Sequence, residues 1–192
     1  MYKKQMILQR IVCYIVLIAS ALVFIYSLGL MTDLYDNKLH YYAEDIMNPM
    51  VAGSEVYYHM QGFNQLLTTA GIVLLLLAAS LFLFQNHVRR KYYIANYITT
   101  ALHSVASVGI SIWALINVFA YKAEYLLIDF EQLKTYAGLF GFGYTESTFW
   151  FDISILVFGM LLISVGLNIY NLVLKRKCMA SEKQLLENNR EV

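Results

Sequence analysis

Four long apolar runs, none containing Asp, Glu, Lys or Arg, dominate the pattern of hydrophobic and polar positions along the chain. They extend from Ile11 to Met31, from Gln65 to Phe84, from Ile98 to Tyr121 and from Ile153 to Leu174. A helix needs about 20 apolar residues to cross a hydrocarbon core about 30 Å thick, and each run is long enough. The pattern predicts transmembrane helices at about residues 11–31, 63–85, 94–121 and 149–174.

The first run has an alternative interpretation as a cleaved signal peptide. Basic residues precede it, and Ala19-Ser20-Ala21 matches the small-x-small pattern of a cleavage site. However, the apolar run continues past Ala21 to Leu30, so no polar region follows that pattern. We therefore interpret the first run as a retained membrane helix.

Composition supports a membrane protein. The chain of 192 residues is 59% hydrophobic and 14% charged, whereas soluble domains are roughly 45 to 50% apolar and about 25% charged. We expect an all-α integral membrane protein in which residues 1–192 form a single membrane domain built on a four-helix transmembrane bundle.

Charge predicts the orientation of the helices in the cell membrane. Eleven of the 14 Lys and Arg residues lie in the N-terminal segment, the short connection 86–93 and the tail 175–192. Ten of the 13 acidic residues lie between Asp33 and Glu55 or between Glu124 and Asp152. Because basic residues accumulate in segments that stay cytoplasmic, we expect both termini inside and the loops 32–62 and 122–148 outside.

Two function classes are disfavoured. Cys13 and Cys178 both fall on the expected cytoplasmic side, where structural disulfides are rare, which excludes four-helix thiol oxidoreductases with paired outer cysteines. The basic clusters adjoin the bilayer and are explained by topology, so we expect no binding of nucleic acid.

The two outer loops are long enough to have structure of their own. Apolar residues recur at intervals of three and four from Lys122 to Phe140, which predicts an amphipathic helix, and no Gly or Pro separates it from the third membrane helix. The loop 32–62 shows helical stretches on either side of a turn at Asn48-Pro49. We expect the two loops to form a small helical cap.

One group in the first outer loop has the spacing of a metal site. Asp36, His40 and Glu44 lie four residues apart, on one face of a helix, and carboxylate and imidazole groups bind zinc. The alternative is a solvated acidic face with one histidine. No H-E-x-x-H pattern supports the metal, and we expect no cofactor.

Inside the expected membrane region, His103, Asn168 and Ser80 fall at similar depths and are predicted to form one polar layer. An ionisable residue in a membrane is a functional candidate. The alternative is hydrogen bonding that holds helices together, worth about 0.6 to 2 kcal/mol. We favour this structural role, because no carboxylate accompanies the histidine in the middle of the membrane.

A stripe of small residues on the third membrane helix predicts a packing seam. Its members recur at intervals of four and three, namely Thr100, Ser104, Ser107, Ser111 and Ala114. Small residues let helix backbones approach closely in lipid. Gly159, Ile163 and Gly166 on the fourth helix, with Ser20 and Ser27 on the first, are the expected complementary notches.

Three functional hypotheses follow. The first is a non-enzymatic accessory subunit that docks onto a larger membrane complex, such as a multisubunit importer of carbohydrate or another solute, because aromatic loops and small-residue seams are typical of recognition surfaces. The second is a small transporter or channel, acting alone or as a homo-oligomer. The third is an outward-facing metal-dependent enzyme built on Asp36, His40 and Glu44.

Overall fold

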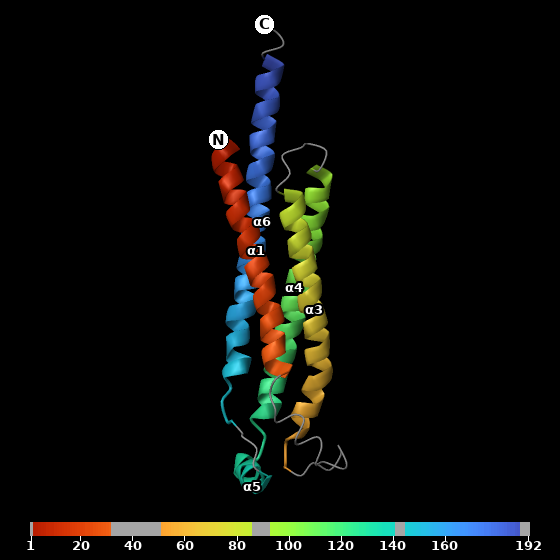
Figure 1. Ribbon diagram of the computed structural model, residues 1–192, viewed down its shortest axis with the longest axis vertical. Helices are drawn as coiled ribbons and strands as arrows, with labels where there is room; N and C mark the ends of the chain where they lie inside the picture. Colours follow the sequence, from red (N-terminus) through yellow and green to blue (C-terminus); the bar gives the residue numbers. More distant parts are fainter. Residues whose placement is uncertain (1, 32–50, 86–92, 141–144, 189–192) are drawn as a thin grey trace. The chain divides into compact units, whose positions relative to one another are not determined.

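The computed structural model describes residues 2–31, 51–85, 93–140 and 145–188, and this part of the chain consists of helices joined by short turns, with no strand (Figure 1). The helices are α1 (Tyr2–Met31), α3 (Glu55–Gln85), α4 (Tyr93–Tyr125), α5 (Phe130–Phe140) and α6 (Phe149–Asn188).

Four of these helices are long and apolar enough to cross a membrane. The qualifying spans are Lys4–Gly29, Glu55–Gln85, Ile94–Tyr125 and Phe149–Ser181. The prediction of an all-α protein with four helices that are long and apolar enough to span a membrane is therefore confirmed for the described residues. The helices are also longer than the apolar runs, and α6 continues beyond Leu174 because its polar extension is rich in good helix formers such as Lys, Leu, Gln and Glu.

Large apolar side chains cover the outside of these helices, as a lipid environment requires. Ile18, Leu66 and Val105 are among many that are more than half exposed. In a bilayer every backbone polar group must be bonded internally, and long helices satisfy this condition.

The chain divides into two compact units, which are described separately. Unit 1 consists of Met1–Ala21, Val73–Gly109 and Gly159–Val192, and unit 2 consists of Leu22–Ile72 and Ile110–Phe158. Each of the four long helices contributes one segment to each unit.

Unit 1 has an apolar core contributed by α1 and α3. Val12 and Val16 of α1 pack with Ala78 and Leu81 of α3, and partly buried leucines surround them. Unit 1 also buries several amide and hydroxyl side chains, among them Gln85, Asn96 and Asn168, which are described below.

Aromatic rings make up much of the core of unit 2. Tyr125 is at its centre, with its ring centroid 5.1 Å from that of Phe151, 5.5 Å from that of Phe130 and 6.2 Å from that of Tyr57. Such tilted and edge-on pairs contribute about 0.5 to 1.5 kcal/mol each beyond the burial of their surface.

The amphipathic helix expected over 122–140 is in fact divided by a turn. Residues 122–125 complete α4, and α5 starts at Phe130. Asp129 ends the continuity because its carboxylate accepts a hydrogen bond from the Gln132 amide, at 3.0 Å, in the manner of a helix N-cap. Within α5 the predicted face is confirmed at Leu133 and Ala137, which are buried.

A second turn, at residues 51–54, packs against the turn that precedes α5. The Asp129 amide donates to the Ala52 carbonyl at 3.0 Å, and the Ala52 amide donates to the Gln132 side chain at 3.2 Å. Gly53 has a φ of 82°, and a Cβ there would lie 2.7 Å from the Leu127 carbonyl oxygen. Only glycine fits this close approach. Residues 32–50 and 141–144 of the expected cap are outside the described residues.

Candidate functional site

A network of buried amide and hydroxyl side chains in unit 1 is the main polar feature of the described membrane helices, and Gln85 is its centre. The Gln85 side-chain nitrogen donates to Thr100 Oγ1 at 3.2 Å and to Asn168 Oδ1 at 2.9 Å. The Gln85 side-chain oxygen accepts a hydrogen bond from the Cys13 thiol at 3.2 Å. Gln85 therefore links α3 to α1, α4 and α6 through one side chain.

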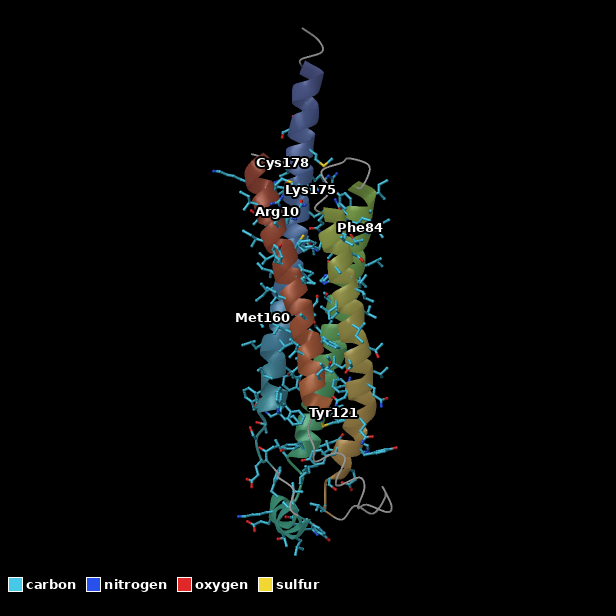
Figure 2. All side chains as sticks on the ribbon, viewed as in Figure 1. Arg10, Phe84, Tyr121, Met160, Lys175 and Cys178 are labelled. Atoms are coloured by element: carbon cyan, nitrogen blue, oxygen red, sulfur yellow. The ribbon has the colours of Figure 1, made fainter. Side chains whose placement is uncertain are left out.

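The main chain of Gln85 adds two further links. Gln85 is the last residue of α3, so its carbonyl has no partner within the helix. The Gln9 side chain donates to this carbonyl, and Lys175 Nζ donates to it at 3.3 Å. A cation at a helix C-terminus also interacts favourably with the helix dipole. Figure 2 shows Lys175 at a level of unit 1 similar to that of Arg10 and Phe84.

Gln5 and Gln9 extend the network along α1. The Gln5 side-chain nitrogen donates to Gln9 Oε1 at 3.2 Å and to Asn171 Oδ1 at 3.3 Å. The N-terminal part of α1 therefore lies beside the C-terminal part of α6 within unit 1 (Figure 1). All three side chains are buried.

His103 is also buried in unit 1, between two serine hydroxyls. Its Nε2 lies 3.3 Å from Ser20 Oγ, and its Nδ1 lies 3.5 Å from Ser107 Oγ. Ser20 donates its own hydrogen to the Val16 carbonyl, so Ser20 Oγ is left to accept from the Nε2 hydrogen. Nδ1 then accepts from Ser107. A neutral imidazole satisfies every position in this chain of hydrogen bonds, which fits a structural role.

The structure places the three members of the predicted polar layer differently. Asn168 belongs to the Gln85 network, whereas His103 bonds to serines of α1 and α4. Ser80 donates to the Leu76 carbonyl of its own helix at 2.9 Å. No hydrogen bond between the three residues is present among the described contacts.

The predicted seam on α4 lies mostly inside the chain. In unit 1, Thr100 and Ser107 are buried and Ser104 is partly buried, and in unit 2 Ser111 and Ala114 are buried. The stripe therefore serves packing within this chain. Gly159 and Gly166 of α6 behave differently, because a Cβ added at either position meets no atom within 4 Å.

The three metal-ligand candidates, Asp36, His40 and Glu44, are outside the described residues. Within the ranges that the structure describes, no group of three or more His, Cys, Asp and Glu side chains is placed to hold a metal ion. The metal-dependent alternative stays a prediction.

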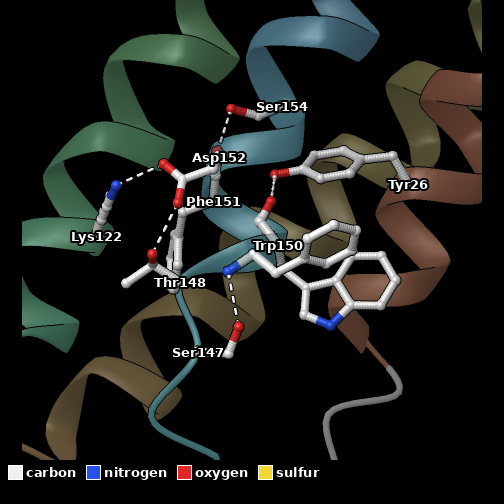
Figure 3. Close-up of polar contacts among 9 residues, drawn as sticks. Tyr26, Lys122, Ser147, Thr148, Trp150, Phe151, Asp152 and Ser154 are labelled. Atoms are coloured by element: carbon white, nitrogen blue, oxygen red, sulfur yellow. Dashed lines mark hydrogen bonds and ion pairs between the residues drawn. The ribbon is translucent and has the colours of Figure 1, made fainter.

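Unit 2 has its own polar contacts where α6 begins (Figure 3). Lys122 of α4 lies 2.5 Å from one Asp152 carboxylate oxygen, and Thr148 donates to the other at 2.7 Å. Ser147 Oγ accepts from the Phe149 amide at 3.2 Å. The Ser147 contact gives a backbone amide in the first turn of α6 a hydrogen-bond partner, and the Lys122 contact attaches this turn to α4. Both contacts fit a stabilising role.

An apolar groove lies between α1 and α6 in unit 2. It has a volume of about 380 Å³ and is lined by Leu22, Ile25, Tyr26, Leu28, Gly29, Trp150, Ile153 and Val157. Tyr26 joins the two helices by donating to the Trp150 carbonyl at 3.0 Å (Figure 3). The Trp150 ring lies against Gly29, where a Cβ would approach it to 2.8 Å.

Sequence reasoning missed the centre of the polar network. Gln5, Gln9 and Gln85 lie at or beyond the ends of the apolar runs, where polar residues are expected to meet water or lipid head groups. One signal was present in the sequence. Gln5 and Gln9 are four residues apart, and so on one helix face, in a segment that is otherwise apolar and basic.

Comparisons with protein-family models, curated proteins and solved structures find no match. A function for this chain is therefore inferred from its own residues and contacts.

Proposed function

We propose that the chain is a non-enzymatic accessory subunit of a larger membrane complex, in the cell membrane with both termini cytoplasmic. The observation that carries the proposal is an outward notch on α6, formed by Gly159, Ile163 and Gly166. These residues are spaced by four and three, so they share a helix face. Ile163 is 65% exposed, and both glycines have open space where a Cβ would be.

Two glycines with open space on one face of α6 leave a surface with little side-chain bulk, whereas Gly109, the one glycine of α4, stands alone. Glycine in a helix interior is about 1 kcal/mol less favourable than alanine. Small residues in membrane helices are useful where another helix approaches closely, since van der Waals packing drives association in lipid. Because the α4 stripe is used within the chain, the α6 notch is the surface that we assign to a partner.

The interior of unit 1 supports a structural role over a transport pathway. Both side-chain hydrogens of Gln85 are bonded to Thr100 and Asn168. His103 is held by Ser20 and Ser107 in an arrangement that a neutral ring satisfies. These groups tie helices together, as interhelical hydrogen bonds do in other membrane bundles.

A multisubunit importer of carbohydrate or another solute is the kind of complex that we propose. The tyrosine-rich outer segments favour recognition, since aromatic side chains bury much surface at little entropic cost. In this view the loops 32–62 and 122–148 form an outer cap that faces a partner or a solute.

The test compares three glycine variants in the native host. Gly159→Leu and Gly166→Leu fill the notch, and Gly109→Leu of α4 is the matched control, because a Cβ at Gly109 also meets no atom within 4 Å. The tagged proteins are purified in mild detergent, and their co-purifying proteins are quantified by mass spectrometry. We expect the notch variants to lose a stoichiometric membrane partner that the wild type and Gly109→Leu retain.

A crosslinking experiment locates the contact directly. A photoreactive phenylalanine derivative at Ile163 should form a defined adduct with the partner, whereas the same residue at Ile112, an exposed position on α4, should not. Equal partner recovery in all three glycine variants, together with equal crosslinking from both sites, would refute the assignment of the notch.

A small homo-oligomeric transporter or channel is the second candidate, favoured by unpartnered amide groups in the interior of unit 1. Asn96 Oδ1 and Asn168 Nδ2 are buried without a hydrogen-bond partner among the described residues. Native mass spectrometry separates the two functions. A homogeneous homo-oligomer, together with solute flux in reconstituted vesicles, would replace the accessory role.

A further inference from the structure

Three buried polar atoms of unit 1 have no hydrogen-bond partner among the described residues. They are Asn96 Oδ1 and Ser104 Oγ of α4 and Asn168 Nδ2 of α6. Asn96 is 2% exposed and Asn168 is 1% exposed. In folded proteins buried polar groups are nearly always bonded, because an unbonded group costs about the full desolvation penalty.

The three residues that carry these atoms are neighbours of the Gln85 network in sequence spacing or by direct contact. Asn96, Thr100 and Ser104 are spaced by four residues, so they lie on one face of α4 with about 6 Å of rise between neighbours. Thr100 is connected to Asn168 by the Gln85 side chain, with distances of 3.2 Å and 2.9 Å. Asn96 and Ser104 are therefore one turn to either side of Thr100 on α4, and Asn168 of α6 is joined to Thr100 through Gln85.

Exchanging the side-chain nitrogen and oxygen of Asn168 does not supply the missing hydrogen-bond partner. Asn168 Oδ1 accepts from Gln85 Nε2, and an exchange of the two Asn168 atoms would bring two donors together. The donor of Asn168 and the acceptor of Asn96 are chemically complementary. A small neutral molecule that both donates and accepts hydrogen bonds satisfies them together.

We propose that this part of unit 1 is a binding site for ordered water. One water accepts from Asn168 Nδ2 and connects it to Asn96 Oδ1, directly or through a second water, and another binds Ser104 Oγ. Buried waters typically make about three hydrogen bonds to groups of this kind. A divalent cation fits less well, because such ions take six or more oxygen ligands and favour carboxylates. This proposal is independent of the accessory role.

The test uses the sign of a stability change. Ser104→Ala removes one partner of a bound water, whereas in a dry site it removes an unbonded hydroxyl and stabilises the protein. Ser164→Ala is the matched control, because Ser164 is a buried serine of unit 1 that donates to the Leu161 carbonyl of its own helix at 2.7 Å. With bound water, we expect Ser104→Ala to lower the Tm in detergent by about 2 to 4 °C relative to Ser164→Ala. An equal or higher Tm would overturn the proposal.

A second measurement examines the unaltered protein. In a map of the chain in lipid nanodiscs that is sharp enough to show water, a water-sized peak should lie within hydrogen-bond distance of Asn168 Nδ2. Well-defined Asn96 and Asn168 side chains without such a peak would contradict the proposal, and so would density of a larger solute or of an ion with short ligand distances.

Discussion

Replacing Gln85 with leucine tests whether the polar network stabilises unit 1. The change removes three side-chain hydrogen bonds, those with Thr100, Asn168 and Cys13. The main-chain carbonyl of residue 85 is kept, so the links from Gln9 and Lys175 stay possible. Leucine is similar in size to glutamine, so the variant isolates the polar contacts.

The expected magnitude follows from these bonds. Interhelical hydrogen bonds in membrane proteins average about 0.6 kcal/mol and reach about 1.7, so the two bonds from the Gln85 amide contribute about 1 to 3 kcal/mol. The thiol is a weak donor and adds little. Losing Gln85 also leaves Asn168 Oδ1 without its donor, which adds a desolvation cost of about 1 kcal/mol or more. We expect Gln85→Leu to lower the free energy of unfolding by about 3 kcal/mol.

Reversible unfolding in mixed micelles with increasing SDS measures this difference. Far-UV circular dichroism follows all helices, whereas the fluorescence of Trp113 and Trp150 follows unit 2, which contains both tryptophans. Because the substitution is in unit 1, we expect the circular dichroism transition to shift by at least as much as the fluorescence transition.

Gln65→Leu is the control, since Gln65 lies on the same helix with an exposed side chain. We expect this control to change the free energy of unfolding by less than about 0.5 kcal/mol, as is usual for surface substitutions. If Gln85→Leu were as stable as Gln65→Leu, the network would not be a stabilising element, and the structural interpretation of Asn168 would also fail.

Two further substitutions test packing within each unit, both by the same unfolding assay. Gly53→Ala should lower the free energy of unfolding by more than about 1 kcal/mol, because its φ of 82° is unfavourable for alanine and the added Cβ would meet Leu127 backbone. Gly62→Ala, at a helical position with open space, should be neutral or stabilising, and equal effects of the two would contradict this reasoning. Ser107→Leu should destabilise unit 1 by about 1 to 3 kcal/mol through overpacking beside His103, and an unchanged transition would show that the seam has spare room.

The four membrane helices were predictable because the bilayer imposes a simple requirement. A spanning helix needs an uninterrupted apolar run, and such a run is visible in sequence without knowledge of tertiary contacts. The turn before α5 was harder to foresee. Asp129 has a polar position in the amphipathic pattern, and only its capping bond to the Gln132 amide marks it as the start of a new helix.

The polar network was only partly predictable. Asn168 and His103 stand out within apolar runs, whereas Gln85 stands at the end of one. Its partners depend on the rotation and depth of each helix. Gln9 and Gln85 are 76 residues apart in the chain, and Gln5 and Asn171 are 166 apart. Sequence spacing places residues on a common helix face but does not determine which faces meet.

By itself, the sequence determined the helical class of the described chain and the number of its membrane-spanning helices, since both follow from local patterns in a nonpolar solvent. Tertiary structure decided which small residues pack inside the chain and which leave an open notch. It also decided which polar groups pair across helices and which lack a partner. The physical reason is that burial and hydrogen bonding in a bundle depend on the neighbours that each helix face meets.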